Sequence, residues 1–391
     1  MNKQNFIGSL GAALLLATSV STFGQSAWET VDDFQSIPGK GAAVAGLAAA
    51  GNGIVFSACM MGDPAGQQHG IIRRSLDGGQ SWLNVFDVPG TTFANCWSVT
   101  VGPSGAVFAT ASARPPGSPN SKNWLTIRSI DGGDTWDIVD SFIASGLYNS
   151  PFAVVQDGVG RVFAGGMMWD AQGKHHWLIR RSLDGGTTWA TVDDIPGANP
   201  AVMGMTVSPA GVFAAGRLSN AWIVRRSTNG GATWTTVDDY RVPTYGSYAN
   251  GITSDASGNL YVTGAANLTV KRITKTHWIT RRSTNGGATW QTVDDVISGS
   301  SNVGKSITAD VYGRIFTSGQ INSGNTSRWI TRASINGGAT WVTTDDYAGS
   351  TGINTFPRGA ASDAVGNVFV GGQANGSDGV AHAVVRKLAT P

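Results

Sequence analysis

The stretch RRSTNGGATWTTVDDY, residues 225–240, decides the fold because it recurs along the chain. It returns almost unchanged as RRSTNGGATWQTVDDV at 281–296, and four looser copies exist. A tryptophan opens each W-x-x-V-type segment, and successive tryptophans are 45 to 56 residues apart. These tryptophans are Trp28, Trp82, Trp136, Trp189, Trp234, Trp290 and Trp341. A period of this length indicates a fold that repeats one supersecondary unit.

Each unit contains four expected strands. In the sixth copy, KSITADVYGRIFTSG (305–319) has two strand-like stretches around a DVYG turn, and RWITRASINGG (328–338) ends in a second turn. Such alternation between tight turns indicates antiparallel strands. We therefore expect an all-β fold, a seven-bladed β-propeller of four-stranded antiparallel blades. The last copy lacks an outer strand, which AWETVDDF (27–34) supplies, so that the N-terminal strand closes the last blade and no sheet edge stays open.

Composition narrows the function classes. The 391 residues include 54 glycines and only 13% charged residues, which suits many tight turns. The formal net charge of +2, without a basic stripe, argues against nucleic-acid binding. Residues 1–24 combine Lys3, the apolar run 6–20 and small residues, the pattern of a secretory signal peptide. We expect a secreted or periplasmic monomer, with residues 25–391 as the propeller, no membrane span and no cofactor.

A family resemblance rests on SLDGGTTW, residues 182–189. It resembles the Asp box, S-x-D-x-G-x-T-W, of the sialidase-type propellers, and as a repeat pattern the resemblance covers nearly the whole chain after the signal segment. The box position holds Asp77, Asp131, Asp184, Asn229, Asn285 and Asn336. Asp and Asn both bond nearby backbone N–H groups and tolerate the left-handed conformation, so we expect structural turn residues. Similar boxes occur in sialidases, xyloglucan-cleaving hydrolases, sortilin-type receptors and non-enzymatic propellers.

The resemblance does not extend to sialidase chemistry. Sialidases of this kind use an arginine triad, a Tyr nucleophile with a Glu partner, and an Asp acid/base. Ser36, in QSIPG, stands where their R-I-P motif carries the first arginine, and Glu29 is the single glutamate of the chain. We therefore expect no sialidase activity.

The paired carboxylates of the repeat form columns. The first column holds Asp32, Phe86, Asp140, Asp193, Asp238, Asp294 and Asp345. A second column, before each box, holds Arg73, Ile127, Arg180, Arg225, Arg281, Arg332 and Arg386. One copy loses both charge types together, at Phe86 and Ile127. We expect Arg–Asp pairs that link outer strands, between neighbouring blades.

Residues that break the pattern are the candidate binding site. The short turns lie on one face of the ring, the turn face, and the variable loops lie on the other, the loop face, where function usually resides. A column of small residues on the innermost strands follows Ala45, Trp97, Phe152, Met203, Asn250, Lys305 and Arg358. We expect this column near the loop-face mouth of the channel, with apolar groups on one side and polar groups on the other. Such a mouth suits a sugar, and equally a peptide or an anionic ligand, unless it is ordinary core variation. Trp169 is a further candidate ligand-binding residue.

An enzyme would need other residues. Glycosidases need two carboxyl groups about 5–10 Å apart, and the candidate catalytic acids on the loop face are Asp63, Asp378 and Asp170, of which the first two lie in adjacent blades. Cys59 is expected to end the second strand of one blade and Cys96 to begin the first strand of the next, both on the loop face, which predicts a disulfide in an oxidising compartment. The histidines do not converge, so we expect no metal site.

These observations favour a non-catalytic propeller that binds a glycan or another cell-surface ligand at its loop face. Two alternatives stay open: a glycoside hydrolase or polysaccharide-active enzyme of the same propeller class, and a protein–protein interaction scaffold.

Overall fold

The structure is a computed structural model that describes residues 28–115, 117, 121–143, 148–242 and 246–390. The expected signal segment, 1–24, lies outside the described residues. The regular secondary structure of the described chain is all β-strand apart from one 3-10 helix, η1 (Gly51–Gly53). Within these ranges no helix has the length and apolar character that crossing a membrane requires.

The strands fall into four concentric groups. Innermost are β2 (Ala42–Ala49), β6 (Phe93–Val101), β10 (Asn149–Gln156), β14 (Ala201–Ser208), β18 (Ser247–Ser254), β22 (Ser301–Ala309) and β26 (Phe356–Ser362). Second are β3 (Val55–Gly62), β7 (Val107–Arg114), β11 (Val162–Trp169), β15 (Gly211–Leu218), β19 (Leu260–Val270), β23 (Ile315–Ser323) and β27 (Val368–Asn375). Third are β4 (Gln68–Ser75), β8 (Asn123–Ser129), β12 (His175–Ser182), β16 (Ala221–Ser227), β20 (Ile273–Ser283), β24 (Thr326–Ser334) and β28 (Ala381–Leu388). Outermost are β5 (Leu83–Asp87), β9 (Asp137–Phe142), β13 (Ala190–Gly197), β17 (Thr235–Tyr240), β21 (Gln291–Val296), β25 (Val342–Tyr347) and β1 (Glu29–Phe34).

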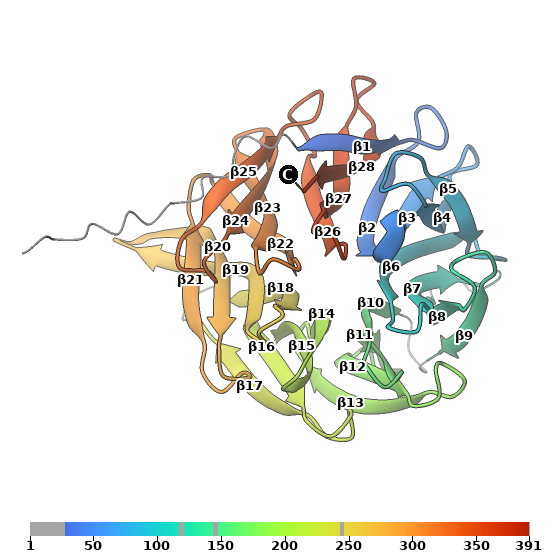
Figure 1. Ribbon diagram of the computed structural model, residues 1–391, viewed down its shortest axis with the longest axis horizontal. Helices are drawn as coiled ribbons and strands as arrows, with labels where there is room; N and C mark the ends of the chain where they lie inside the picture. Colours follow the sequence, from blue (N-terminus) through green and yellow to red (C-terminus); the bar gives the residue numbers. More distant parts are fainter. Residues whose placement is uncertain (1–27, 116, 118–120, 144–147, 243–245, 391) are drawn as a thin grey trace, which may run out of the picture.

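The strands pair antiparallel in runs of four, each of which we call a blade. Three blades are separate four-stranded sheets, and two eight-stranded sheets each contain two such runs. The runs within an eight-stranded sheet are joined by a single parallel residue pair, Gln68 with Phe93 in one and Thr276 with Ser301 in the other. Each innermost strand contacts the next, and β26 contacts β2, so that the blades close into a ring (Figure 1).

The ring is closed by the two ends of the described chain. β1 pairs antiparallel with β28, with Thr30 opposite Arg386, and completes the sheet that begins with β26. In Figure 1 the blue β1 therefore lies beside the red β28. The sequence predicts this pairing, which covers the edge of β28.

The core lies between the faces of adjacent blades. One apolar cluster, for example, joins Phe56 of β3 to Val99 and Val107 of the following blade. The third strands contribute fully buried tryptophans, namely Trp124, Trp177, Trp222, Trp278 and Trp329. Burial of side chains this large is a main driving force for packing the blades together.

The repeated turn between the third and fourth strands has one geometry. At its first occurrence, Ser75 Oγ accepts a hydrogen bond from the N–H of Gly79 at 2.8 Å, and Asp77 Oδ1 accepts one from the N–H of Ser81 at 2.9 Å. Trp82 Nε1 donates to the carbonyl of Gly79 at 3.0 Å. Gly79 has φ = 94°, a conformation that disfavours any residue with a Cβ.

Asparagine makes the same turn. Asn229 Oδ1 accepts from the N–H of Thr233 at 3.0 Å, as the aspartate does, while its Nδ2 donates to Thr233 Oγ1 at 2.9 Å. In the aspartate copies the direction of that second bond is reversed, since Thr188 Oγ1 donates to Asp184 Oδ2 at 2.7 Å. The turn therefore needs the shape and acceptor of the side chain and does not need its charge.

The Arg–Asp pairs expected from the sequence are confirmed, and each joins two neighbouring blades. The arginine lies on a third strand and the aspartate on the outer strand of the preceding blade. The pairs are Arg73–Asp32, Arg180–Asp140, Arg225–Asp193, Arg281–Asp238, Arg332–Asp294 and Arg386–Asp345. We call this set the Arg–Asp girdle; its side chains are largely buried.

The girdle is interrupted at the position that the sequence predicts. Phe86 of β5 and Ile127 of β8 belong to one apolar cluster, and Phe86 also packs against Trp136 with ring centroids 6.0 Å apart. The strand partner of Ile127 is Ile138, whereas the girdle arginines have a threonine as strand partner or, beside Arg73, Asn84. An apolar contact thus replaces the ion pair together with its polar strand partner.

Candidate functional site

An axial cavity of about 160 Å³ lies at the centre of the ring. Three successive positions of the innermost strands line it. The first ring contains Ala45, Trp97, Phe152, Met203, Asn250, Lys305 and Arg358; the second contains Gly46, Ser98, Ala153, Gly204, Gly251, Ser306 and Gly359. The third, nearest the turn face, contains Leu47, Val154, Met205, Ile252, Ile307 and Ala360.

The structure therefore brings the predicted column together around one cavity, but at a different depth. Ala45 is the fourth residue of the eight in β2, and Lys305 the fifth of the nine in β22. The cavity lies midway along the innermost strands, whereas the sequence suggested the loop-face mouth. The aromatic and charged groups are in the first ring, which is nearest the loop face, and the third ring is apolar. A ligand that contacts these groups would therefore reach them from the loop face.

A β-bulge in every innermost strand creates the first ring. In β2, Val44 pairs with Cys59 and Gly46 with Ala58, so that Ala45 has no partner on β3. The same shift skips the first-ring residue of the other innermost strands, namely Trp97, Phe152, Met203, Asn250, Lys305 and Arg358. A bulge adds one residue to a strand and re-aims its side chain. It explains how two consecutive residues can both line the cavity.

Crowding between innermost strands explains the small residues of the second ring. A Cβ on Gly46 would lie 2.8 Å from the carbonyl oxygen of Trp97, and one on Gly359 would lie 2.9 Å from the Cα of Gly46. These approaches are closer than van der Waals contact, so the ring closes only with small side chains here.

The aromatic side of the cavity is held by specific contacts. Trp97 and Phe152 meet edge to face, with ring centroids 5.2 Å apart and an interplanar angle of 80°. Trp97 Nε1 donates to Ser112 Oγ at 2.9 Å, which fixes the orientation of the indole. Aromatic rings in this arrangement form a rigid wall.

The polar side carries two cations, Lys305 and Arg358, that form no ion pair with any carboxylate of the described residues. Asn250 Nδ2 donates to the carbonyl of Gly304 at 2.7 Å, which leaves its own oxygen available. Burial, helped by the neighbouring Arg358, lowers the pKa of Lys305, and burial also lowers the pKa of Arg358. Arg358 Nη2 makes one long hydrogen bond, 3.4 Å to Gln373 Oε1, and its Nε has no partner in the described structure.

Trp169 lies apart from this cavity. It stacks on His175 with centroids 4.4 Å apart and an interplanar angle of 12°, and it also contacts Tyr148. It is not among the lining residues of the cavity. Trp169 departs from the repeat, as the sequence indicates, but in the structure it makes a local aromatic contact at the end of β11.

The candidate catalytic acids are tied to their own blades. Asp63 accepts from His69 at 3.5 Å, and Asp170 lies 3.3 Å from Nε2 of His176. Asp378 lies 3.3 Å from Nε2 of His382. We chose these acids from the sequence because they lie outside the repeated columns. The structure shows instead that all three share one role in the loops between second and third strands.

These three histidines, and His277 as well, also bind the second aspartate of the paired carboxylates on the outer strand. The contacts of their Nδ1 atoms, 2.6 to 2.9 Å long, are His69–Asp87, His176–Asp194, His277–Asp295 and His382–Asp33. Backbone hydrogen bonds from Lys174 and Val380 are the largest influences that lower the pKa of Asp170 and Asp378, respectively. A glycosidic general acid needs a raised pKa, so these environments favour a structural role.

The two cysteines are free thiols, in contrast to the predicted disulfide. Both are fully buried, and they belong to different apolar clusters. Cys59 Sγ contacts Ser57 Oγ at 3.4 Å on its own strand. Burial raises the pKa of Cys59 to about 11 and that of Cys96 well above its ordinary value, which keeps both protonated and unreactive.

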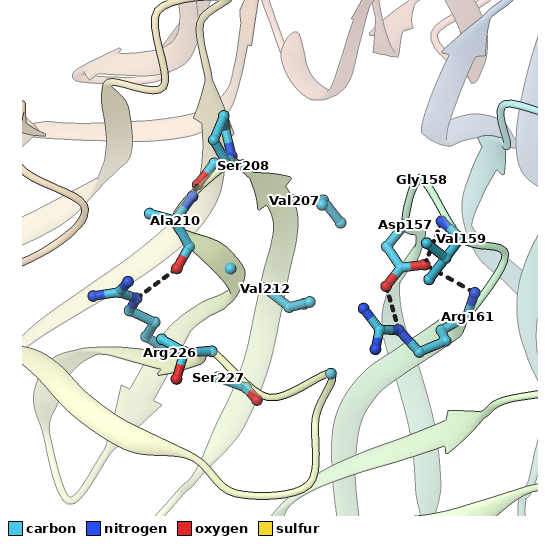
Figure 2. Close-up of a pocket in the computed structure, with 14 residues that line it drawn as sticks. Asp157, Gly158, Val159, Arg161, Val207, Ser208, Ala210, Val212, Arg226 and Ser227 are labelled. Atoms are coloured by element: carbon cyan, nitrogen blue, oxygen red, sulfur yellow. Dashed lines mark hydrogen bonds and ion pairs between the residues drawn. The ribbon is translucent and has the colours of Figure 1, made fainter.

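A larger hollow, about 450 Å³, lies on the turn face between the blades of β10 and β14 (Figure 2). Only residues 209–210 connect β14 to β15, because Ser208 already pairs with Gly211, whereas residues 157–161 connect β10 to β11. The charged groups there are satisfied: Arg161 pairs with Asp157, and Arg226 Nε donates to the carbonyl of Ala210. The hollow is thus a consequence of a short turn. Over the described residues, no group of three or more His, Cys, Asp or Glu could hold a metal ion.

Comparison with known proteins supports the fold. No family model and no curated protein matches this sequence. Among solved structures, a protein of unknown function from Dyadobacter fermentans is 15% identical with a TM-score of 0.52, over 93% of this chain and 99% of that one. An α-L-arabinanase from Penicillium chrysogenum, complexed with arabinobiose, is 13% identical with a TM-score of 0.51, over 88% and 92%. An α-L-arabinofuranosidase from Fusarium graminearum is 12% identical with a TM-score of 0.50, over 88% and 92%. At these identities the likeness shows the β-propeller fold alone.

Proposed function

We propose that the protein is an exported, seven-bladed Asp-box propeller that binds the end of a glycan in its axial cavity without cleaving it. The blade count takes each four-strand run as one blade, including the two runs in each eight-stranded sheet. Export rests on the signal pattern of residues 1–24. The observation that carries the binding proposal is the lining of the cavity.

The lining matches the two kinds of surface on a sugar. Trp97 and Phe152 offer an apolar wall for the face of a sugar ring, and Asn250 offers an amide for its hydroxyl groups. The volume of about 160 Å³ is below the ~300–1,000 Å³ of pockets that enclose drug-sized ligands. The proposal is therefore that one terminal unit enters while the rest of the chain extends toward the loop face.

Binding without cleavage is favoured by the residue types present. The described residues that line the cavity include no Asp, Glu, His, Tyr or Cys. Glycoside hydrolysis generally needs two carboxyl groups at the scissile bond. Asp63 and Asp378, the best pair for an enzyme, instead bind histidines of their own blades.

The second candidate function is glycoside hydrolysis. It is favoured by the arabinanase and arabinofuranosidase named among the similar structures, which act on carbohydrate with a similar fold. It would need carboxyl groups outside the cavity lining. Sugar release from a polysaccharide panel, lost in Asp63→Asn or Asp378→Asn, would establish hydrolysis.

A glycan array tests the binding proposal. The exported protein, Phe152→Ala and Trp169→Ala are compared; the last variant removes an aromatic group outside the cavity. The proposal predicts glycan binding that Phe152→Ala weakens at least about tenfold, since one lost aromatic contact costs roughly 0.5–1.5 kcal/mol beyond lost burial. Equal loss in Trp169→Ala would place glycan binding outside the axial cavity, and no glycan bound at all would favour a pure interaction scaffold. Thermal unfolding shows whether each variant is folded.

A further inference from the structure

We propose that Lys305 and Arg358 form an anion-binding subsite of the axial cavity, which selects glycans that end in a carboxylate- or sulfate-bearing sugar. This inference rests on the proposed function and adds the class of ligand. It is carried by the placement of the two cations and by the polar atoms around them.

The two cations are neighbours in the ring. They are the bulged residues of β22 and β26, which contact each other, and both line the same cavity. Neither forms an ion pair with any described carboxylate. The charges of the girdle differ in this respect, because every girdle arginine has its aspartate. Two half-buried like charges repel each other, and an anion between them would relieve that repulsion.

Unused donors point to the same place. Arg358 Nε has no hydrogen-bond partner among the described residues. Ser306 Oγ also lacks one, and Ser306 is only 5% exposed. Lys305 makes no hydrogen bond in the described structure. Buried donors without partners are unfavourable, and charge-assisted bonds to an oxyanion would satisfy them.

The aromatic wall and the two cations lie on different parts of the ring. Phe152 comes from β10, which lies across the ring from β22 and β26, whereas Trp97 comes from β6, which only β2 separates from β26 (Figure 1). A sugar unit placed against the aromatic wall would thus direct its acidic substituent toward the cations. Ser36, where the sialidase motif has an arginine, is not among the lining residues. The subsite is therefore formed by positions of this chain that the resemblance does not assign.

Matched polysaccharide pairs test the subsite at constant ionic strength. Polygalacturonate is compared with its full methyl ester, and carrageenan with agarose, so that carboxylate and sulfate are examined separately. At least one acidic member should bind the wild-type protein about tenfold or more tightly than its neutral counterpart. Lys305→Gln and Arg358→Gln should each remove that preference, while Arg272→Gln, which neutralises an exposed cation in the loop between β19 and β20, should keep it.

A second arm needs no glycan. Sulfate stabilises folded proteins in general, so the informative quantity is the difference between wild type and variant. At low millimolar concentration and equal ionic strength, sulfate should raise the melting temperature relative to chloride more in the wild-type protein than in Arg358→Gln. Neutral and acidic glycans bound alike, with the same sulfate effect in both proteins, would overturn the subsite and leave glycan binding intact. A sulfate effect that depends on Arg358, with no glycan bound, would support the subsite and refute the proposed function.

Discussion

Arg180 on β12 and Asp140 on β9 form a bidentate ion pair between neighbouring blades: Nε and Nη2 donate to the two carboxylate oxygens at 2.6 and 2.9 Å. The guanidinium also lies over the ring of Phe142, 4.3 Å from its centroid. Both charged side chains are about nine-tenths buried. The girdle therefore joins blades through groups that cannot be left unpaired without cost.

The natural gap in the girdle provides the design of a test. Asp140→Phe or Arg180→Ile alone should destabilise the fold by about 3–5 kcal/mol, because each leaves a buried charge unpaired. The double variant reproduces the pair Phe86 and Ile127 and should lose much less than the sum of the single variants. Chemical denaturation of all four proteins gives the coupling energy. Strictly additive losses would contradict a coupled pair.

Crowding at the axis makes a second prediction. Gly46→Ala should destabilise the protein by about 1–3 kcal/mol, because the new Cβ would lie 2.8 Å from the carbonyl oxygen of Trp97. Gly51→Ala is the control, since nothing lies within 4 Å of its Cβ position. The two melting temperatures should differ clearly. Equal values would mean that the innermost strands are farther apart than described.

The repeated turns predict an acid-sensitive component of stability. Hydrogen bonds, chiefly from Ser81 and Thr188, lower the pKa of Asp77 and of Asp184 to about 2. A lowered pKa in the folded state stabilises the protein above the unfolded value near 3.8, and this contribution is lost as the pH falls toward 2. The double variant Asp77→Asn/Asp184→Asn should reduce the pH dependence of the free energy of unfolding between pH 4 and 2, measured by urea unfolding. The asparagine turns show that the substitution fits the geometry, so an unchanged slope would refute the assignment.

The thiols give a direct chemical test. Native protein should show no reactive thiol toward a disulfide reagent, because Cys59 and Cys96 are fully buried with raised pKa values. After unfolding without reductant, two thiols should react. Zero thiols after unfolding would instead establish the disulfide that the sequence predicts.

Much of the fold could be predicted from the sequence because the repeats can be aligned, so that equivalent positions can be compared. The girdle was predictable because Phe86 and Ile127 change together, which only a contact between the two columns explains. The first ring was predictable as a set because its members vary beside a column of small residues. In each case a departure from the repeat, and not the repeat itself, carried the information.

Other features depend on contacts that no repeat pattern displays. Every innermost strand has the same bulge, so the alignment of the copies does not reveal it, and the depth of Lys305 in the channel could not be deduced. Asp63 and Asp170 looked irregular because their loops differ in sequence, although both bind the histidine six residues later. The cysteines lie on adjacent blades as expected, but in separate apolar clusters, which strand order alone does not reveal.

The most direct test of the proposed function is a crystal structure with the best-binding array glycan. The account predicts density for the terminal sugar inside the axial cavity, against Trp97 and Phe152, with any acidic substituent at Lys305 and Arg358. Density for the glycan at the loop rim beside Trp169, or beside Asp63 and Asp378, with an empty axial cavity, would contradict it.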